Sequence, residues 1–188
     1  MKMNIRNVFV SRVVHWLVGI ALIVSVTPGY SQDVANGQAI ANVLIGLSVV
    51  AVQDLNFGNV LQGVAKSVTN DDAANTGIFL ITGEGGAGIS VYINLPTYIA
   101  TATGDDRMSI GFMTTDCSID STGNVDPSAF GDGWPDIDPH NLPNGLTVGS
   151  AVPNQTAVFL GGRVWPSVDQ LSGPYSGDII VTVAYTGT

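Results

Sequence analysis

Short segments with an apolar residue at every second position are the strongest constraint on how this chain folds. Hydrophobic and polar residues alternate along much of residues 39–185, and Gly, Pro, Asn and Asp interrupt them at short intervals. Such alternation is typical of β-strands, because an amphipathic helix repeats every 3.6 residues. We therefore predict an all-β fold, a sandwich or barrel, with strands at residues 39–45, 47–52, 55–60, 77–82, 89–94, 107–114, 145–150, 157–164 and 177–185.

The first 31 residues have the layout of a secretory signal. Three basic residues precede or begin an apolar stretch that runs from residue 13 to 26, and residues 27–31 contain Pro, Gly and small side chains. The apolar stretch is shorter than the ~20 residues that cross a bilayer. We expect cleavage after Ser31, export to the cell exterior and no membrane attachment of the mature chain, with an uncleaved anchor as the alternative.

The net charge excludes some classes of partner, and the cysteine content excludes a disulfide within the chain. Residues 32–188 contain three basic and fifteen acidic residues, a net charge of −12. Such a surface repels nucleic acid and anionic lipid. Cys117 is the only cysteine, which rules out an intramolecular disulfide and favours a small buried side chain over a reactive thiol. We expect one β-sandwich domain at residues 54–188, preceded by an apolar arm with the first strands at residues 32–53.

Residues that could carry catalysis are scarce. Residues 83–88 match G-x-G-x-x-G, but a strand-like segment follows them, whereas a dinucleotide site needs a helix N-terminus there. His140 is the only histidine after the signal, which excludes a zinc site with several His or Cys ligands, and no G-x-S-x-G surrounds a serine. We expect no enzymatic activity and no cofactor, apart from the cation considered next.

Residues 115–143 lose the hydrophobic alternation and contain six aspartates among Gly, Ser, Asn and Pro. This composition predicts one long acidic loop. Calcium prefers six to eight oxygen ligands, although the spacing here is not that of an EF-hand. A calcium or other divalent site and a solvated acidic loop both remain open, and the candidate ligands are Asp116, Asp120, Asn124, Asp126, Asp132, Asp136 and Asp138.

Residues 39–52 are apolar on both faces of the predicted strand. A strand of this kind needs cover on both faces. It could add to the sheet edge of a neighbouring subunit, where main-chain hydrogen bonds and alternate side chains would hold it, or it could be an ordinary first strand of its own sandwich. The residues of one parity, which we assign to a subunit interface, are Ala39, Ala41, Val43, Ile45, Leu47, Val49 and Ala51.

Three motifs carry a family resemblance. Residues 55–60 read Leu-Asn-Phe-Gly-Asn-Val, residues 159–164 read Phe-Leu-Gly-Gly-Arg-Val, and residues 170–177 read Gln-Leu-Ser-Gly-Pro-Tyr-Ser-Gly before a final Val-Thr-Val-Ala-Tyr strand. Together they resemble the secreted bacterial family of domain of unknown function 4402. The resemblance implies an immunoglobulin-like β-sandwich similar to pilins or surface subunits, and its motifs are structural rather than catalytic. The acidic insertion departs from the family's commoner form.

Two functional hypotheses follow. The first is a secreted structural subunit that self-assembles by strand donation into an extracellular filament or surface layer, and is therefore a homo-oligomer. The alternative is a monomeric, calcium-dependent adhesin, in which Trp134 and His140 contact a glycan or a protein on a host or cell surface. Removal of the arm would abolish assembly under the first hypothesis and leave the adhesin competent under the second.

Overall fold

The computed structural model describes residues 38 and 40–187, and the chain divides into two units at residues 1–41 and 42–188. The predicted signal, residues 1–31, lies outside the described residues, as does Ala39. In the first unit Gln38, Ile40 and Ala41 are described, and they have no regular secondary structure. Within the described part of the chain, no helix is long and apolar enough to span a membrane.

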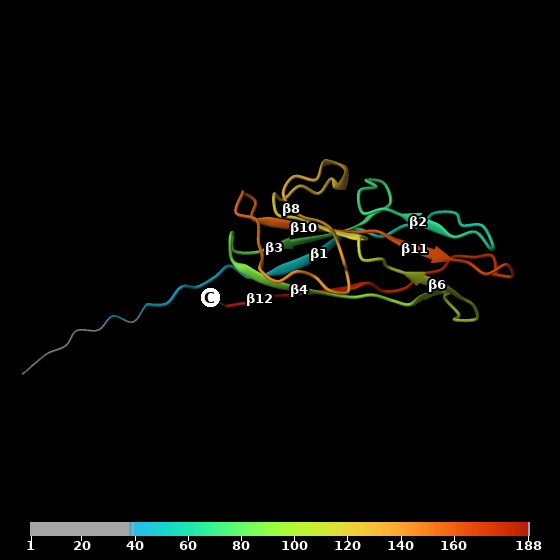
Figure 1. Ribbon diagram of the computed structural model, residues 1–188. Coiled ribbons are helices and arrows are strands. Elements are labelled where there is room, and N and C mark those ends of the chain that lie inside the picture. The colour runs from blue at the N-terminus through green and yellow to red at the C-terminus, as the bar shows by residue number, and fades with distance from the viewer. Residues whose placement is uncertain (1–37, 39, 188) are drawn as a thin grey trace, which may run out of the picture. The chain divides into compact units, whose positions relative to one another are not determined.

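The second unit is an all-β fold of antiparallel sheets packed together, as the alternation predicted (Figure 1). A single turn of 3-10 helix, η1, is its only helical element among the described residues. The elements are β1 (Ser48–Gln53), β2 (Lys66–Val68), β3 (Gly77–Thr82), β4 (Gly88–Asn94), β5 (Tyr98–Ala100), β6 (Arg107–Gly111), β7 (Cys117–Asp120), η1 (Pro127–Ala129), β8 (Gly133–Ile137), β9 (Leu146–Thr147), β10 (Gln155–Leu160), β11 (Gly162–Trp165) and β12 (Ile180–Tyr185).

One layer contains two sheets joined end to end. The first has the order β1-β3-β10-β7-β8 and the second the order β2-β11-β6-β5. The predicted strand at residues 157–164 is interrupted at Gly161, which separates β10 from β11. A side chain at Gly161 would place its Cβ 2.5 Å from the carbonyl oxygen of Val68, so the close approach of this neighbouring segment requires glycine.

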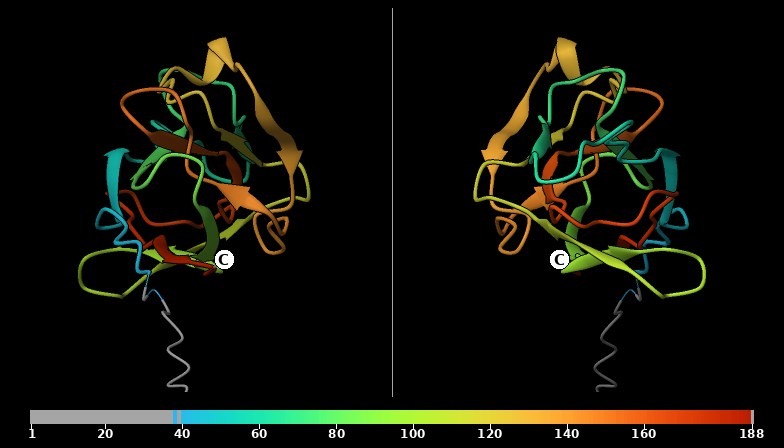
Figure 2. Two further views of the ribbon diagram at one scale, coloured as in Figure 1. Left: turned by 90° about the vertical axis from the view of Figure 1, so that its left-hand side faces the viewer. Right: turned by 90° about the vertical axis from the view of Figure 1, so that its right-hand side faces the viewer.

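The other layer is a three-stranded sheet with the order β12-β4-β9. Viewed end-on, the two layers enclose the interior (Figure 2). The main core lies between β3, β7 and β10 on one side and β4 and β9 on the other. Its fully or nearly fully buried members are Phe79, Ile81, Ile89, Ile93, Cys117, Ile119, Leu146, Val148, Val158 and Leu160.

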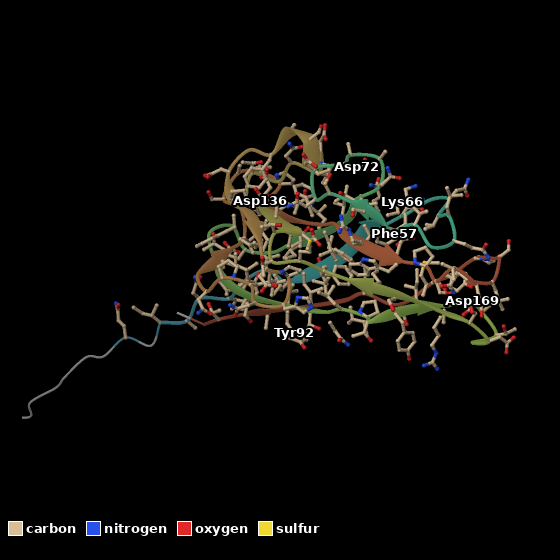
Figure 3. All side chains as sticks on the ribbon, turned by 45° about the vertical axis from the view of Figure 1, so that its right-hand side comes forward. Phe57, Lys66, Asp72, Tyr92, Asp136 and Asp169 are labelled. Carbon is tan, nitrogen blue, oxygen red and sulfur yellow. The ribbon has the colours of Figure 1, made fainter. Side chains whose placement is uncertain are left out.

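The segment predicted as one long acidic loop, residues 115–143, contains two strands, β7 and β8, and the 3-10 turn η1, with loop between and after them. β7 is buried at all four positions, with Cys117 and Ile119 facing the main core. The outward faces of β3 and β10 form a second, outer cluster of Ile78, Ala157 and Phe159, against which Phe130 packs. Residues 121–137, which we call the outer excursion, therefore pack Phe130 against the outer cluster and then return as the edge strand β8. Figure 3 shows Asp136 of the outer excursion on the same side of the unit as Asp72 and opposite Tyr92.

Several strand predictions need correction. The predictions at residues 77–82 and 89–94 are confirmed, and that at 47–52 corresponds to β1. The described residues between 40 and 47, and residues 55–60, are not strands. Within residues 55–60 a single main-chain bond, from the N–H of Asn56 to the carbonyl oxygen of Asn75 at 2.9 Å, reaches another segment, and one such bond does not make a ladder. β2, β5, β7 and β8 were missed, since each is short or holds polar residues. β1 pairs with β3, so the boundary predicted after residue 53 separates a strand from its own sheet.

Candidate functional site

One half of the predicted arm packs against the rest of the second unit, and the other half is exposed. Leu47 and Val49 pack against the main core, so the prediction of a free arm reaching Val52 was too long. Before them, the Tyr185 hydroxyl donates a hydrogen bond of 2.7 Å to the carbonyl oxygen of Ile45. Val43 is 90% exposed. The described residues of the exposed half are Gln38 and residues 40–44, and we call them the free arm.

A large groove lies on one side of the second unit, and we call it the edge groove. Its volume is ≈ 1410 Å³. The apolar inner face of the β11-β6-β5 strands contributes Met108, Ile110 and Val164 to its lining, and residues 54–62 and 171–179 form its two walls. The first wall continues from the end of β1 and the second leads into β12. The groove therefore lies between the segment that follows β1 of one layer and the segment that precedes β12 of the other layer.

The first wall was predicted as a strand, and the second wall contains the predicted corner that precedes the last strand, but neither wall forms a strand. Residues 55–60 keep the alternation, with Phe57 buried and its neighbours exposed. Among the described residues, the main chain of residues 57–60 and 172–175 makes no backbone hydrogen bond to another segment. The predicted last strand begins at residue 177, whereas β12 begins only at Ile180. Side chains take the place of a strand partner in the first wall, where the Gly58 N–H donates to Oδ1 of Asn56 and the Asn59 carbonyl oxygen accepts from Nζ of Lys66.

A hydrogen-bonded corner holds the second wall in place. The Tyr175 hydroxyl lies 2.5 Å from Oδ2 of Asp106, and the same oxygen accepts from the Leu171 main-chain N–H at 2.7 Å and from Nε2 of Gln170 at 2.6 Å. Gln170 is buried. It also accepts from the N–H of Ser167. The Gly-Pro-Tyr-Ser-Gly motif thus fixes the wall through a tyrosine hydroxyl, as expected for a tight corner.

This corner shifts two pKa values in opposite directions. Hydrogen bonds from Tyr175 and then from the Leu171 N–H hold the pKa of Asp106 below its ordinary value of 3.8. Desolvation, followed by the hydrogen bond to Asp106, raises the pKa of Tyr175 above 10.0. The hydrogen-bonded corner is therefore most stable at pH values above the pKa of Asp106 and below the pKa of Tyr175.

The variant Asp106→Asn is expected to remove an acid-dependent part of the stability. Because the folded pKa of Asp106 lies below the unfolded one, its contribution is present above pH 3.8 and disappears as the pH falls through the folded pKa. The urea midpoint of the parent should therefore fall more steeply than that of the variant between pH about 4 and about 2. Asp105→Asn, at the exposed neighbouring position, is the matched control. Identical acid profiles for the parent and Asp106→Asn would contradict the corner.

The candidate calcium ligands are spread out and engaged locally. Asp120 is fully buried, and its carboxylate accepts from the N–H and hydroxyl of Thr122 and from the N–H of Gly131. Asp126 caps η1 through Ser128. Among the described residues, no three His, Cys, Asp or Glu side chains gather as a metal site would require. The divalent site stays a prediction.

The remaining candidate ligands also have separate roles. Asp116 accepts from the N–H of Met113, Asp136 from the Asn70 side chain, and Asp138 from both the N–H and the ring of His140. Asn124 donates to the carbonyl oxygen of Ala129, and Asp132 is exposed. Their hydrogen bonds shape turns, which explains why a region so rich in aspartate is ordered.

The other residues discussed from sequence have structural positions. Cys117 is buried, and desolvation raises the pKa of its thiol, as expected for an unreactive cysteine. Trp134 lies on β8 and is 41% exposed, and the His140 ring lies edge-on to Phe112. The glycine-rich segment at residues 83–87 joins β3 of one layer to β4 of the other, so it is a connection between sheets and not a hairpin.

Comparison with known proteins adds no relative. No family model, no curated protein and no solved structure matches this chain. The resemblance to the family of domain of unknown function 4402 stays a prediction, and the site rests on its own geometry.

Proposed function

We propose that this protein is a secreted structural subunit that self-assembles into an extracellular filament or surface layer, by donation of its free arm to a neighbouring copy. The observation that carries the proposal is the exposure of apolar side chains on the free arm, where Ile40 is 88% and Val43 90% exposed. Apolar side chains in series at a chain end are commonly covered in an assembly, and an extended segment gains main-chain hydrogen bonds by adding to a sheet edge.

The open sheet edges support the same proposal. β1 is an edge strand of the five-stranded sheet, and β12 is an edge strand of the three-stranded sheet. Their exposed side chains include Val50, Val52 and Ile180. Edges that are neither charged nor covered invite pairing with another chain. An arm that adds to such an edge of a neighbouring copy makes a head-to-tail contact, and contacts of this kind produce open filaments when the rotation between copies does not close.

The acidic charge of the sandwich favours a donor segment that has no charged side chains. Residues 34–53 contain no charged side chain, whereas residues 54–188 contain fourteen of the fifteen acidic residues. An acidic donor would be repelled by such a surface. The same charge means that copies repel one another at a distance, so assembly should become easier as salt or divalent cations screen the carboxylates.

Deletion of residues 33–44 is expected to abolish assembly without unfolding the subunit. The deletion stops before Ile45 because Ile45 to Gln53 are held by Tyr185 and β3. The removed side chains are exposed where they are described, so the free energy of unfolding should change by less than about 0.5 kcal/mol. Negative-stain electron microscopy and sedimentation of protein isolated from producing cells measure assembly, and urea unfolding measures stability.

A pair of point variants separates apolar donation from mere chain length. Val43→Asp should prevent assembly, whereas Val168→Asp, at another highly exposed valine, should leave it intact. Dispersed single particles from the unmodified chain would overturn the proposal. That result would favour the calcium-dependent adhesin, for which calcium titration and glycan binding become the next measurements.

A further inference from the structure

We propose that the outer face of the β2-β11-β6-β5 sheet binds an acidic polysaccharide, a polymer of sugar rings that bear carboxylates. This inference does not depend on the proposed function, because it concerns a surface that belongs neither to the free arm nor to the edge groove. The four strands contain all three basic residues of residues 32–188 and no acidic residue. Positive charge is therefore concentrated on this sheet, although residues 32–188 have a net charge of −12.

The strand register gathers two arginines and two aromatic side chains on this outer face. The buried side chains of β6 and β11 point toward the core, so the residues that alternate with them point outward. On β6, Ser109 lies opposite Tyr98 of β5 on one side and Trp165 of β11 on the other. Gly111 lies opposite Arg163. The outward residues, which we call the basic face, are Tyr98, Arg107, Ser109, Gly111, Arg163 and Trp165.

Both arginines of the basic face are oriented by uncharged partners. The guanidinium carbon of Arg107 lies 4.5 Å from the ring centroid of Tyr98, which is a cation–π contact. Nε of Arg163 donates a hydrogen bond of 2.6 Å to Oγ of Ser67. Among the described residues, neither arginine forms an ion pair with a carboxylate. Since the guanidinium fork matches a carboxylate in shape and charge, both side chains are available to an acidic ligand.

Trp165 lies over a glycine that leaves room for its ring. A Cβ at Gly111 would be 2.8 Å from Cζ3 of Trp165. Gly111 does not have a positive φ, so its backbone conformation does not require glycine, and glycine weakens a strand. The missing side chain therefore serves the position of the Trp165 ring. Trp165 stays 43% exposed and Tyr98 45% exposed, so both rings present area to a ligand.

These groups suit a polymer of acidic sugars better than a small anion. The negative face of an aromatic ring attracts the C–H groups on the face of a sugar ring, and a guanidinium binds a carboxylate through two hydrogen bonds. Arg163 lies opposite Gly111, four residues from Arg107, so the two arginines are about 14 Å apart. One small anion cannot reach both arginines, whereas an extended polymer with carboxylates at intervals can.

The charge of the rest of the chain disfavours a densely charged polymer. A nucleic acid strand carries a charge about every 3.4 Å and is bound by a basic stripe, whereas the basic face has two arginines. Carboxylates elsewhere on the chain are screened beyond about 8 Å at physiological ionic strength. A polymer whose charges are spaced by sugar rings can therefore contact the basic face without strong repulsion from the other surfaces.

Affinity electrophoresis of the full chain tests this inference. Native gels that contain polygalacturonate or alginate should retard the chain relative to a gel without polymer. Fully methyl-esterified polygalacturonate, which keeps the sugar rings but lacks free carboxylates, should retard it much less. Arg107→Gln and Arg163→Gln should each raise the Kd for the two acidic polymers by about tenfold or more, the loss expected for a hydrogen bond between charged groups.

Three further variants test the aromatic part of the basic face. Gly111→Ala keeps every charge and both rings but displaces Trp165, so it should weaken binding about as much as Trp165→Ala. Tyr92→Ala, at an exposed tyrosine on β4 of the other layer, is the matched control and should bind like the parent. Urea unfolding shows whether each variant is folded, and the arginine variants keep the test valid if Trp165→Ala is not.

The outcomes separate this inference from the proposed function, which electron microscopy tests independently. Absence of retardation by both acidic polysaccharides would overturn the inference and leave self-assembly standing. Equal retardation by polyglutamate would show that the basic face recognises an acidic protein, which would also overturn it. Loss of binding in Trp134→Ala but not in Trp165→Ala would place the polysaccharide on the surface considered for the adhesin, and not on the basic face.

Discussion

Gly149→Ala is expected to destabilise the protein by about 4 kcal/mol or more, an exceptional loss for one methyl group. Gly149 is buried between β9 and β10, and its N–H donates a 2.9 Å hydrogen bond to the buried hydroxyl of Thr156. A Cβ at this position would overlap the carbonyl oxygens of Ser121 and Gln155. Both oxygens belong to the main chain of packed segments, so neither can move away without opening the sheet.

Gly46→Ala is the matched control for this variant. No atom lies within 4 Å of the position that its Cβ would occupy, so its stability should equal that of the parent or exceed it slightly, because alanine restricts the unfolded chain. Urea unfolding of the two variants, followed by tryptophan fluorescence, gives the comparison. Equal midpoints for Gly149→Ala and Gly46→Ala would show that the segment after β9 does not pack against β10 as described.

The second large effect is expected for Asp120→Ala. The Asp120 carboxylate accepts hydrogen bonds from the N–H of Thr122 at 2.7 Å and the N–H of Gly131 at 2.6 Å, and it is fully buried. Alanine would leave both donors without an acceptor, at a cost of about 1–3 kcal/mol each. The outer excursion should then detach from the sheet. Urea unfolding should show the loss of stability, and limited proteolysis should cut within residues 121–137.

Asp132→Ala provides the control for charge. Asp132 is exposed on the same excursion, so its removal changes the net charge equally but should alter stability by no more than about 0.5 kcal/mol. If the variants at Asp120 and Asp132 behave alike, the buried carboxylate does not organise the excursion. If Asp120→Ala instead raises stability, the burial of this charge opposes folding.

The fold class could be predicted because the alternation of apolar and polar residues indicates a strand with one buried face. β3 and β4 carry strong alternation or continuous apolar runs between turn residues, and their bounds agreed closely with prediction. β7 could not be predicted, because its outward residues Ser118 and Asp120 are polar and yet buried. Their cover comes from residues 121–137, and a sequence pattern does not reveal that a later segment folds back over a strand.

The sequence predicted the arm of the candidate site but not the groove. The apolar arm stood out because both of its faces are hydrophobic, but the sequence does not show where the chain is held by Tyr185, a residue 140 positions away from Ile45. The edge groove was not predicted at all. Residues 55–60 of its first wall were predicted as an ordinary strand, since propensity describes a segment alone and the presence or absence of a neighbour depends on the tertiary structure.

The position of β10 determines when the first layer can form. β10 lies between β3 and β7, which do not pair with each other, so the five-stranded sheet has no centre until residues 155–160 are present. A chain that emerges from its N-terminus can make only separate pairs before then, namely β1-β3, β7-β8 and β5-β6 in this layer and β4-β9 in the other. Pairings so distant in sequence form slowly. A polypeptide with this strand order therefore acquires the centre of its largest sheet only when most of its length has been synthesised.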